Sequence, residues 1–136
     1  MTDKQFTLAQ ASATLPLVRH IVADIMTQYR QWQELVREFE VVAANSRAEL
    51  PDPRAEQLQR QAQSLAKDIE SFVAELTALG VEFKGYDLGL VDFPSEIDGR
   101  PALLCWRYGE PSIAFYHDAE SGYAGRRPIP FAALSY

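Results

Sequence analysis

The chain has 136 residues, 47% of them apolar and 24% charged, a composition typical of a soluble globular protein with its own core. Thirteen basic and nineteen acidic side chains leave a formal charge of −6, which argues against nucleic-acid binding. No apolar stretch approaches membrane-spanning length, and the lone cysteine, Cys105, fits a reducing compartment, so a cytoplasmic protein without membrane association is expected.

Residues 7–80 carry the periodicity of two long helices. Between Leu15 and Phe39, and again between Leu58 and Leu79, apolar side chains recur in alternating steps of three and four. This is the spacing of helices that pack along each other. Prolines interrupt the pattern between the two segments, and a connection of about nine residues is short enough to reverse the chain. The sequence therefore predicts a long antiparallel helical hairpin of the coiled-coil kind.

Capping signals mark the ends of these helices. Thr14 can cap the first long helix, with Pro16 in its first turn, where a missing N–H costs little. Thr7 and Gln10 resemble a capping box, which predicts a separate short helix ahead of it. Gly80 stands where a left-handed residue would end the second helix.

The apolar stripes of both helices are wider than one helix–helix contact needs. Ile21, Leu35 and Val42 widen the first stripe, and Ala66 and Val73 widen the second. At about 25 cal/mol per Å² of apolar surface, covering this flank contributes several kcal/mol. We expect the C-terminal module, a second copy of the hairpin, or both to cover it, and a homodimer with four packed helices is the expected assembly.

Residues 81–136 are predicted to form a small antiparallel β module. All seven glycines and ten of the fifteen aromatic residues lie at or after Gly80. Asp98-Gly99 is a turn signal, and the runs PALLCWRY and SIAFYH predict a β-hairpin with a tight turn at Gly109-Glu110-Pro111. The segment DAESGYAGRRPIP has the composition of a loop. The expected fold is α+β, one domain over residues 1–136.

The faces of the predicted β-hairpin are only partly determined. Alternation places Leu103, Cys105 and Arg107 on one face of the first run, and it places Ile113, Phe115 and His117 on one face of the second. Which faces coincide depends on the loop length, because a slip of one residue inverts the answer. The register is therefore left open.

The stretch CWRYGEPSIAFYHDAESGYAGRRPI, residues 105–129, holds most of the side chains that could form a site. Its glycines could let backbone N–H groups converge while two guanidiniums close over an anion. The predicted ligand-binding residues are Arg107, His117, Arg126 and Arg127 for the anion, Trp106 and Tyr123 for the pocket, and Asp92, Glu110 and Asp118 to orient the basic groups. The alternative is that both arginines pair with Glu110, Asp118 and Glu120 and only hold the loop.

Two other functions remain open beside this interaction or ligand-binding domain. One is a small enzyme that uses His117 with Asp118 or Glu110 for acid/base or metal-assisted chemistry. One histidine with scattered carboxylates falls short of the usual metal-ligand spacing, and His20 lies on the first helix, so no metal site is predicted and the cofactor is unknown. The other is a structural coiled-coil scaffold that binds a partner helix.

Cys105 is predicted to be a buried, inert thiol. It lies inside the apolar run LLCW, where a free cysteine behaves as a small hydrophobic residue. Arg107 is the one evident cation that could stabilise a thiolate there. A nucleophilic role is therefore not expected.

Three phrases, FTLAQASATLPLVRHIV, GLVDFP and LCWRYGEP…FYHDAESGYAGRRPI, resemble an uncharacterised prokaryotic family, domain of unknown function 2203. The likeness covers nearly the whole chain. The sequence matches the family pattern at Asp92, Phe93, Pro94, Trp106, Arg107, Gly109, Glu110, His117, Gly122, Gly125, Arg126 and Arg127, and more loosely at His20. The resemblance implies where a site lies and brings no activity, cofactor or partner with it.

Overall fold

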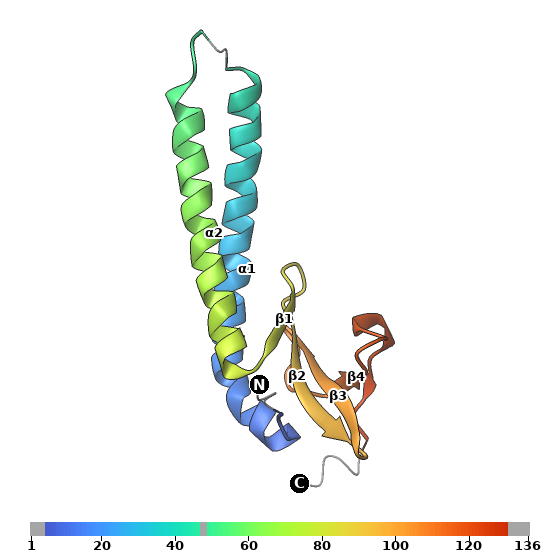
Figure 1. Ribbon diagram of the computed structural model, residues 1–136. Coiled ribbons are helices and arrows are strands. Elements are labelled where there is room, and N and C mark those ends of the chain that lie inside the picture. Colours follow the sequence, from blue (N-terminus) through green and yellow to red (C-terminus); the bar gives the residue numbers. More distant parts are fainter. Residues whose placement is uncertain (1–4, 47–48, 131–136) are drawn as a thin grey trace.

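The computed structural model describes residues 5–46 and 49–130, so residues 131–136 of the predicted β module lie outside it. Two helices, α1 (Leu8–Ala44) and α2 (Pro53–Leu79), pack along each other as a hairpin, and a five-stranded antiparallel sheet follows them (Figure 1). The predicted α+β fold is thereby confirmed. None of the described helices is both long enough and apolar enough to cross a membrane.

Helix α1 begins earlier than its apolar spacing predicts. Thr7 is the N-cap of the whole helix and forms a reciprocal capping box with Gln10. The prediction of a separate leading helix, with a new start at Thr14, is wrong, because the helix continues through Pro16. Buried apolar side chains lie on both sides of the proline, and their packing outweighs the one hydrogen bond that the proline cannot make.

The two helices are joined by residues 45–52, close to the predicted length. Asp52 caps α2 by accepting a hydrogen bond from the backbone N–H of Arg54 at 2.9 Å. At the other end, Gly80 adopts the left-handed conformation with φ 89°, as predicted for the cap. The chain then turns back along the hairpin as the first strand.

The strands are β1 (Glu82–Gly85), β2 (Leu90–Ile97), β3 (Arg100–Arg107), β4 (Phe115–His117) and β5 (Arg127–Pro128), and each pairs with the next. Asp98 and Gly99 join β2 to β3 with positive φ at both residues, 53° and 75°. Two such residues match the twist of the flanking strands in a type I′ turn. The predicted turn is therefore confirmed as a two-residue hairpin.

Strands β3 and β4 pair as predicted, but residues 108–114 connect them in place of a tight turn. Glu110 explains the longer loop. Its carboxylate accepts a hydrogen bond from the backbone N–H of Arg107 at 2.8 Å, and its backbone carbonyl accepts one from the Trp106 indole at 3.1 Å. Ile113 enters the hydrophobic core and does not share a face with Phe115 and His117.

The segment predicted as a loop after His117 also contains regular structure. A short 3₁₀ turn spans Tyr123–Gly125, and β5 follows it. Tyr116 stands opposite Arg127, and Phe115 opposite Pro128. The proline lies on an edge strand, where no partner needs its missing N–H.

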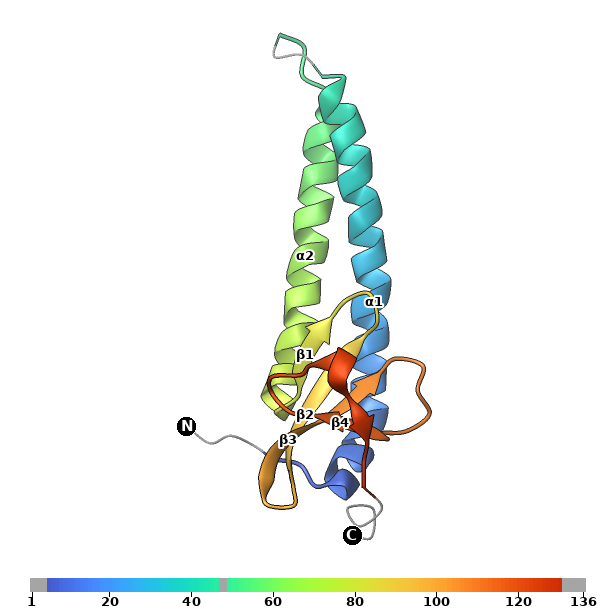
Figure 2. The ribbon, with the colours of Figure 1, turned by 90° about the vertical axis from the view of Figure 1, so that its right-hand side faces the viewer.

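One face of the sheet packs on the base of the hairpin and forms the core. Val91, Phe93, Leu104 and Trp106 from the sheet are buried together with residues of both helices. The fully buried residues of α1 all lie between Ala11 and Ile25, so the outer half of the hairpin projects beyond the sheet (Figures 1 and 2). The opposite face of the sheet points away from the helices.

Candidate functional site

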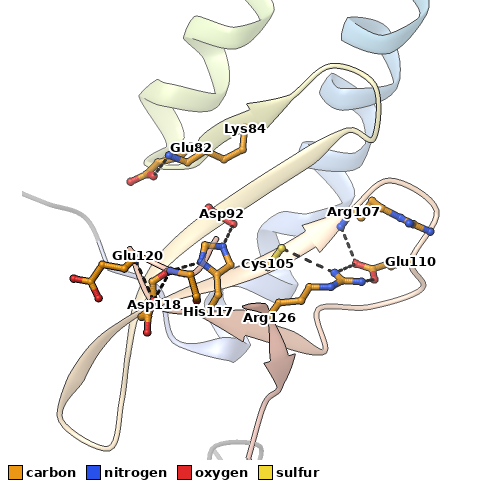
Figure 3. Close-up of polar contacts among 11 residues, drawn as sticks. Glu82, Lys84, Asp92, Cys105, Arg107, Glu110, His117, Asp118, Glu120 and Arg126 are labelled. Atoms are coloured by element: carbon orange, nitrogen blue, oxygen red, sulfur yellow. Dashed lines mark hydrogen bonds and ion pairs between the residues drawn. The ribbon is translucent and has the colours of Figure 1, made fainter. Parts of the chain in front are cut away.

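Three side chains from neighbouring strands meet on the face of the sheet that points away from the helices. Asp92 of β2 stands opposite Cys105 of β3, and His117 of β4 stands opposite Leu103, two residues before the cysteine. Residues two apart on a strand share a face, so the carboxylate, thiol and imidazole lie together (Figure 3). One ligand atom from each residue lies within 4.8 Å of the other two.

These three side chains are buried although they face away from the hairpin. Asp92 is 3% exposed, Cys105 1% and His117 4%. The segment that follows β4 covers them, with Ala119, Gly122 and Tyr123 forming part of the enclosure. Burying three polar groups is costly unless they are paired or bind a ligand.

Both ring nitrogens of His117 are hydrogen-bonded. Nδ1 lies 2.6 Å from the backbone carbonyl oxygen of Asp118, which can only accept, so Nδ1 carries a proton. Nε2 faces Asp92 Oδ1 at 3.0 Å. This is an ordinary hydrogen-bond distance, so a proton carried by the imidazole or by the carboxyl group lies between the two atoms. Burial raises the pKa of Asp92, and the hydrogen bond and charge of His117 only partly offset this.

Cys105 is held as a thiol in this environment. Burial and the nearby Asp92 carboxylate raise the pKa of its sulfhydryl to about 11, although the Arg126 guanidinium opposes them. Arg126 Nη1 lies 4.0 Å from the sulfur, so the cationic neighbour is Arg126 and not the predicted Arg107. Both nitrogens of His117 are engaged elsewhere, so the cysteine has no activating base and is not arranged as a nucleophile.

Arg126 is held from several sides beside this site. Its guanidinium donates to both carboxylate oxygens of Glu110, at 3.1 and 2.6 Å, in a bidentate pair. It also lies between two aromatic rings, 4.1 Å from the Phe115 centroid and 4.6 Å from that of Tyr123. Burial alone would raise the pKa of Glu110, but hydrogen bonds from Arg126 and from the Arg107 N–H lower it overall.

The predicted anion-binding residues do not all come together. Arg107 lies near the site, and its Nη1 donates to the Tyr123 hydroxyl at 3.3 Å. Arg127 lies elsewhere, with its guanidinium 5.2 Å from the Tyr116 ring, and it lines a different cavity with Arg100. The two adjacent arginines therefore do not close over one anion. Arg126 instead follows the alternative expectation, because it forms an ion pair with Glu110 that holds the loop.

Other predicted site residues have structural positions. Trp106 is fully buried in the core on the inner face of β3, so it forms no wall of this site. The Asp118 carboxylate accepts hydrogen bonds from the backbone N–H groups of Glu120 and Ser121, at 3.0 and 2.7 Å, and shapes the turn.

The two histidines have different carboxylate partners. His20 is exposed on α1 and lies 3.7 Å from Asp24. The carboxylate paired with His117 is thus Asp92, and neither Asp118 nor Glu110 takes that place.

A cavity of about 250 Å³ adjoins the buried triad. Asp92, Cys105 and His117 line it together with Leu90, Leu103 and Lys84, and Tyr123 closes one side. Sequence reasoning did not assign Lys84 or Cys105 to a site. The alternation of β3 was the available signal for Cys105, because it sets the thiol on the face opposite the core residues Leu104 and Trp106.

The chain is thus an α+β protein with a helical hairpin followed by an antiparallel sheet. The outer face of that sheet carries a buried carboxylate, thiol and imidazole. The chain belongs to the family of uncharacterised conserved proteins described as DUF2203, whose pattern it matches over residues 4–129. The family suspected from the sequence phrases is thereby confirmed. No curated protein and no solved structure matches the chain.

Proposed function

We propose that this protein binds one divalent transition-metal ion between Asp92, Cys105 and His117 and presents it to the adjoining cavity. The observation that carries the proposal is the convergence of three different ligand groups, all buried, within 4.8 Å. A tetrahedral zinc site with bonds of 2.0–2.3 Å needs its ligand atoms about 3.5 Å apart, a spacing that small side-chain rotations would reach.

The donor set favours zinc over the alkaline-earth ions. Ca²⁺ and Mg²⁺ take oxygen ligands, whereas zinc accepts thiolate sulfur, imidazole nitrogen and carboxylate oxygen together. The His117 ring is already oriented for such a role, since its Nδ1–H donates to a backbone carbonyl and Nε2 points at Asp92. Metal-binding histidines are commonly held by a hydrogen bond of this kind.

Three protein ligands beside a cavity are typical of a catalytic metal and not of a structural one, which is usually closed by four. This supports the metal-assisted enzyme among the functions considered from the sequence, with Asp92 and Cys105 in the places expected for Asp118 and Glu110. A reducing compartment such as the cytoplasm suits the site, because a lone cysteine must stay unoxidised to bind metal.

The test is zinc binding to purified protein after removal of metal by a chelator. We expect one zinc ion per chain by elemental analysis and calorimetry. Cys105→Ala and His117→Ala are each expected to weaken zinc binding by at least about 100-fold, since even the outer partners of metal ligands contribute 10- to 100-fold.

The chain provides its own matched control. His20→Ala removes the other histidine, which is exposed on α1 and distant in the sequence from the triad, and zinc binding is expected to stay unchanged. Wild-type protein that binds no zinc, or binds it equally well without Cys105 and His117, would exclude this function.

We also propose that the outer half of the hairpin mediates self-association. A groove of about 210 Å³ runs between the helices there, lined by large residues of α1 (Trp32, Val36, Phe39) and small residues of α2 (Ala62, Ala66). In a two-fold dimer, the large side chains of one copy could pack on the small ones of the other. This groove supports the expected homodimer with four packed helices.

A further inference from the structure

On the basis of the proposed metal site, we infer that the adjoining cavity takes a small oxyanion, a carboxylate or a phosphate, as its ligand or substrate. The inference concerns the side of the cavity that the three metal ligands leave unused. Two further residues of the lining, Lys84 and Tyr123, carry polar donor groups and are not metal ligands in the proposed site. Each can donate a hydrogen bond toward a ligand bound beside the metal.

The charges of the lining favour an anion once the metal is bound. The two positive charges of the metal balance the Asp92 carboxylate and the Cys105 thiolate. The remaining charge in the lining is the ammonium of Lys84, so the lining itself carries one positive charge, whose present partner, Glu82, lies outside it. An anion that contacts both the metal and Lys84 would neutralise it, whereas a neutral ligand would not.

The present partner of Lys84 does not prevent this role. Its ammonium lies 3.1 Å from Glu82 Oε1, and both side chains are about half exposed, at 50% and 46%. Exposed pairs of this kind contribute roughly 0 to 1 kcal/mol, so the ammonium can turn to a bound anion at little cost. Glu82 itself does not line the cavity.

Tyr123 is oriented by its neighbours as a donor. Its hydroxyl oxygen accepts a hydrogen bond from Arg107 Nη1 at 3.3 Å, which leaves the hydroxyl proton available for a ligand. Its ring packs against the Arg126 guanidinium, whose centre lies 4.6 Å from the ring centroid. Arg107 has no carboxylate within ion-pair distance in the described part of the chain, so its charge adds to the positive potential behind the hydroxyl.

The dimensions of the cavity limit the ligand to a small molecule. A volume of about 250 Å³ is slightly below the range common for drug-sized ligands, 300–1,000 Å³. Leu90 and Leu103 form apolar parts of its wall. An oxyanion on a short carbon skeleton therefore fits better than a nucleotide or a peptide.

Cobalt(II) in place of zinc provides the test, because its visible absorption responds to changes in its ligands. Protein loaded with cobalt is titrated with acetate, inorganic phosphate and, as a neutral comparator, acetamide. We expect acetate or phosphate to change the spectrum at far lower concentration than acetamide. Lys84→Met is expected to weaken that binding about tenfold and Tyr123→Phe about threefold, the usual effects of losing a charged and a neutral hydrogen bond.

Arg100→Met is the matched control, because it removes an exposed cation that lines a different cavity. It is expected to leave anion binding unchanged. Cobalt binding with no preference for the anions, or with equal affinity in wild type and Lys84→Met, would overturn this inference and leave the metal site intact. Failure of cobalt and zinc to bind at all would overturn the metal site as well.

Discussion

The Glu110–Arg126 pair connects the loop after β3 with the segment that covers the candidate site. Glu110 bonds to the backbone N–H of Arg107 on one side and to the Arg126 guanidinium on the other. The side chains of Arg126 and Glu110 are only 15% and 14% exposed. Removing one partner from such a pair leaves the other charge poorly solvated, which is more costly than losing an exposed ion pair.

We therefore expect Glu110→Gln to destabilise the protein by about 2–4 kcal/mol at pH 7. The pKa of Glu110 is lowered in the folded protein, so its stabilising contribution is full above the ordinary pKa of a glutamate and is lost as the pH falls through the lowered value. Urea denaturation of wild type and variant should give a difference in unfolding free energy that shrinks between pH 7 and the acid range.

Glu56→Gln is the control at this scale. Glu56 pairs with Arg60 at 3.9 Å on the exposed surface of α2, so its loss should change stability by less than about 0.5 kcal/mol. An equal effect of Glu110→Gln at neutral and acid pH would show that the carboxylate charge contributes nothing to folding.

At the scale of elements, Gly89 determines how closely the β1–β2 connection approaches α1. Its φ is +63°, and a Cβ there would lie 2.6 Å from Met26 Sδ and 2.9 Å from Val22 Cγ1. Both atoms belong to the part of α1 that packs on the sheet. A glycine is therefore required by the backbone conformation and by the contact with the helix.

We expect Gly89→Ala to destabilise the protein by about 2–5 kcal/mol, because overpacking of about 1–3 kcal/mol adds to the cost of a left-handed alanine, about 1–2 kcal/mol. Gly99→Ala separates the two effects. Gly99 also has a positive φ, 75°, but nothing lies within 4 Å of its Cβ position. Thermal or urea unfolding that gives equal losses for both variants would contradict the close packing on α1.

Helices and strands were predictable to different degrees. The spacing from Leu15 to Phe39 predicted α1 because heptad patterns depend on residues a few positions apart. The start of α1 was predicted at Thr14 and lies at Thr7, because only burial in the folded protein shows that the helix continues through Pro16. The Asp98-Gly99 turn was predictable because its conformation depends on those two residues alone.

The candidate site was predictable only in part. The stretch containing His117 was identified from its composition, and its acid/base partner was sought in Asp118 or Glu110, with Asp92 named only among the carboxylates that orient the basic groups. The true partner, Asp92, lies 25 residues away and meets His117 only through the register of three strands. The pairing of β4 with β3 depends on the connection between them, whose shape Glu110 stabilises. No local sequence pattern predicts this register.

At the scale of the whole molecule, the sheet covers only the base of the hairpin. The groove beyond it carries the proposed self-association, so we expect a dimer in sedimentation velocity experiments at micromolar concentrations. Ala62→Glu places a charge in the groove and should shift the protein to monomer. Gln61→Glu, at the adjacent exposed position, should leave the dimer intact. A wild-type monomer at every accessible concentration would rule this assembly out.

Neighbouring residues of β3 serve different parts of the molecule, since Trp106 lies in the core and Cys105 on the opposite face. A shift of the β3 register by one residue would turn Trp106 out of the core and would remove its packing between the sheet and the helices. A shift of this one strand would therefore lose the core and the site together, so the position of the sulfur is fixed by the same packing that holds the sheet on the helices.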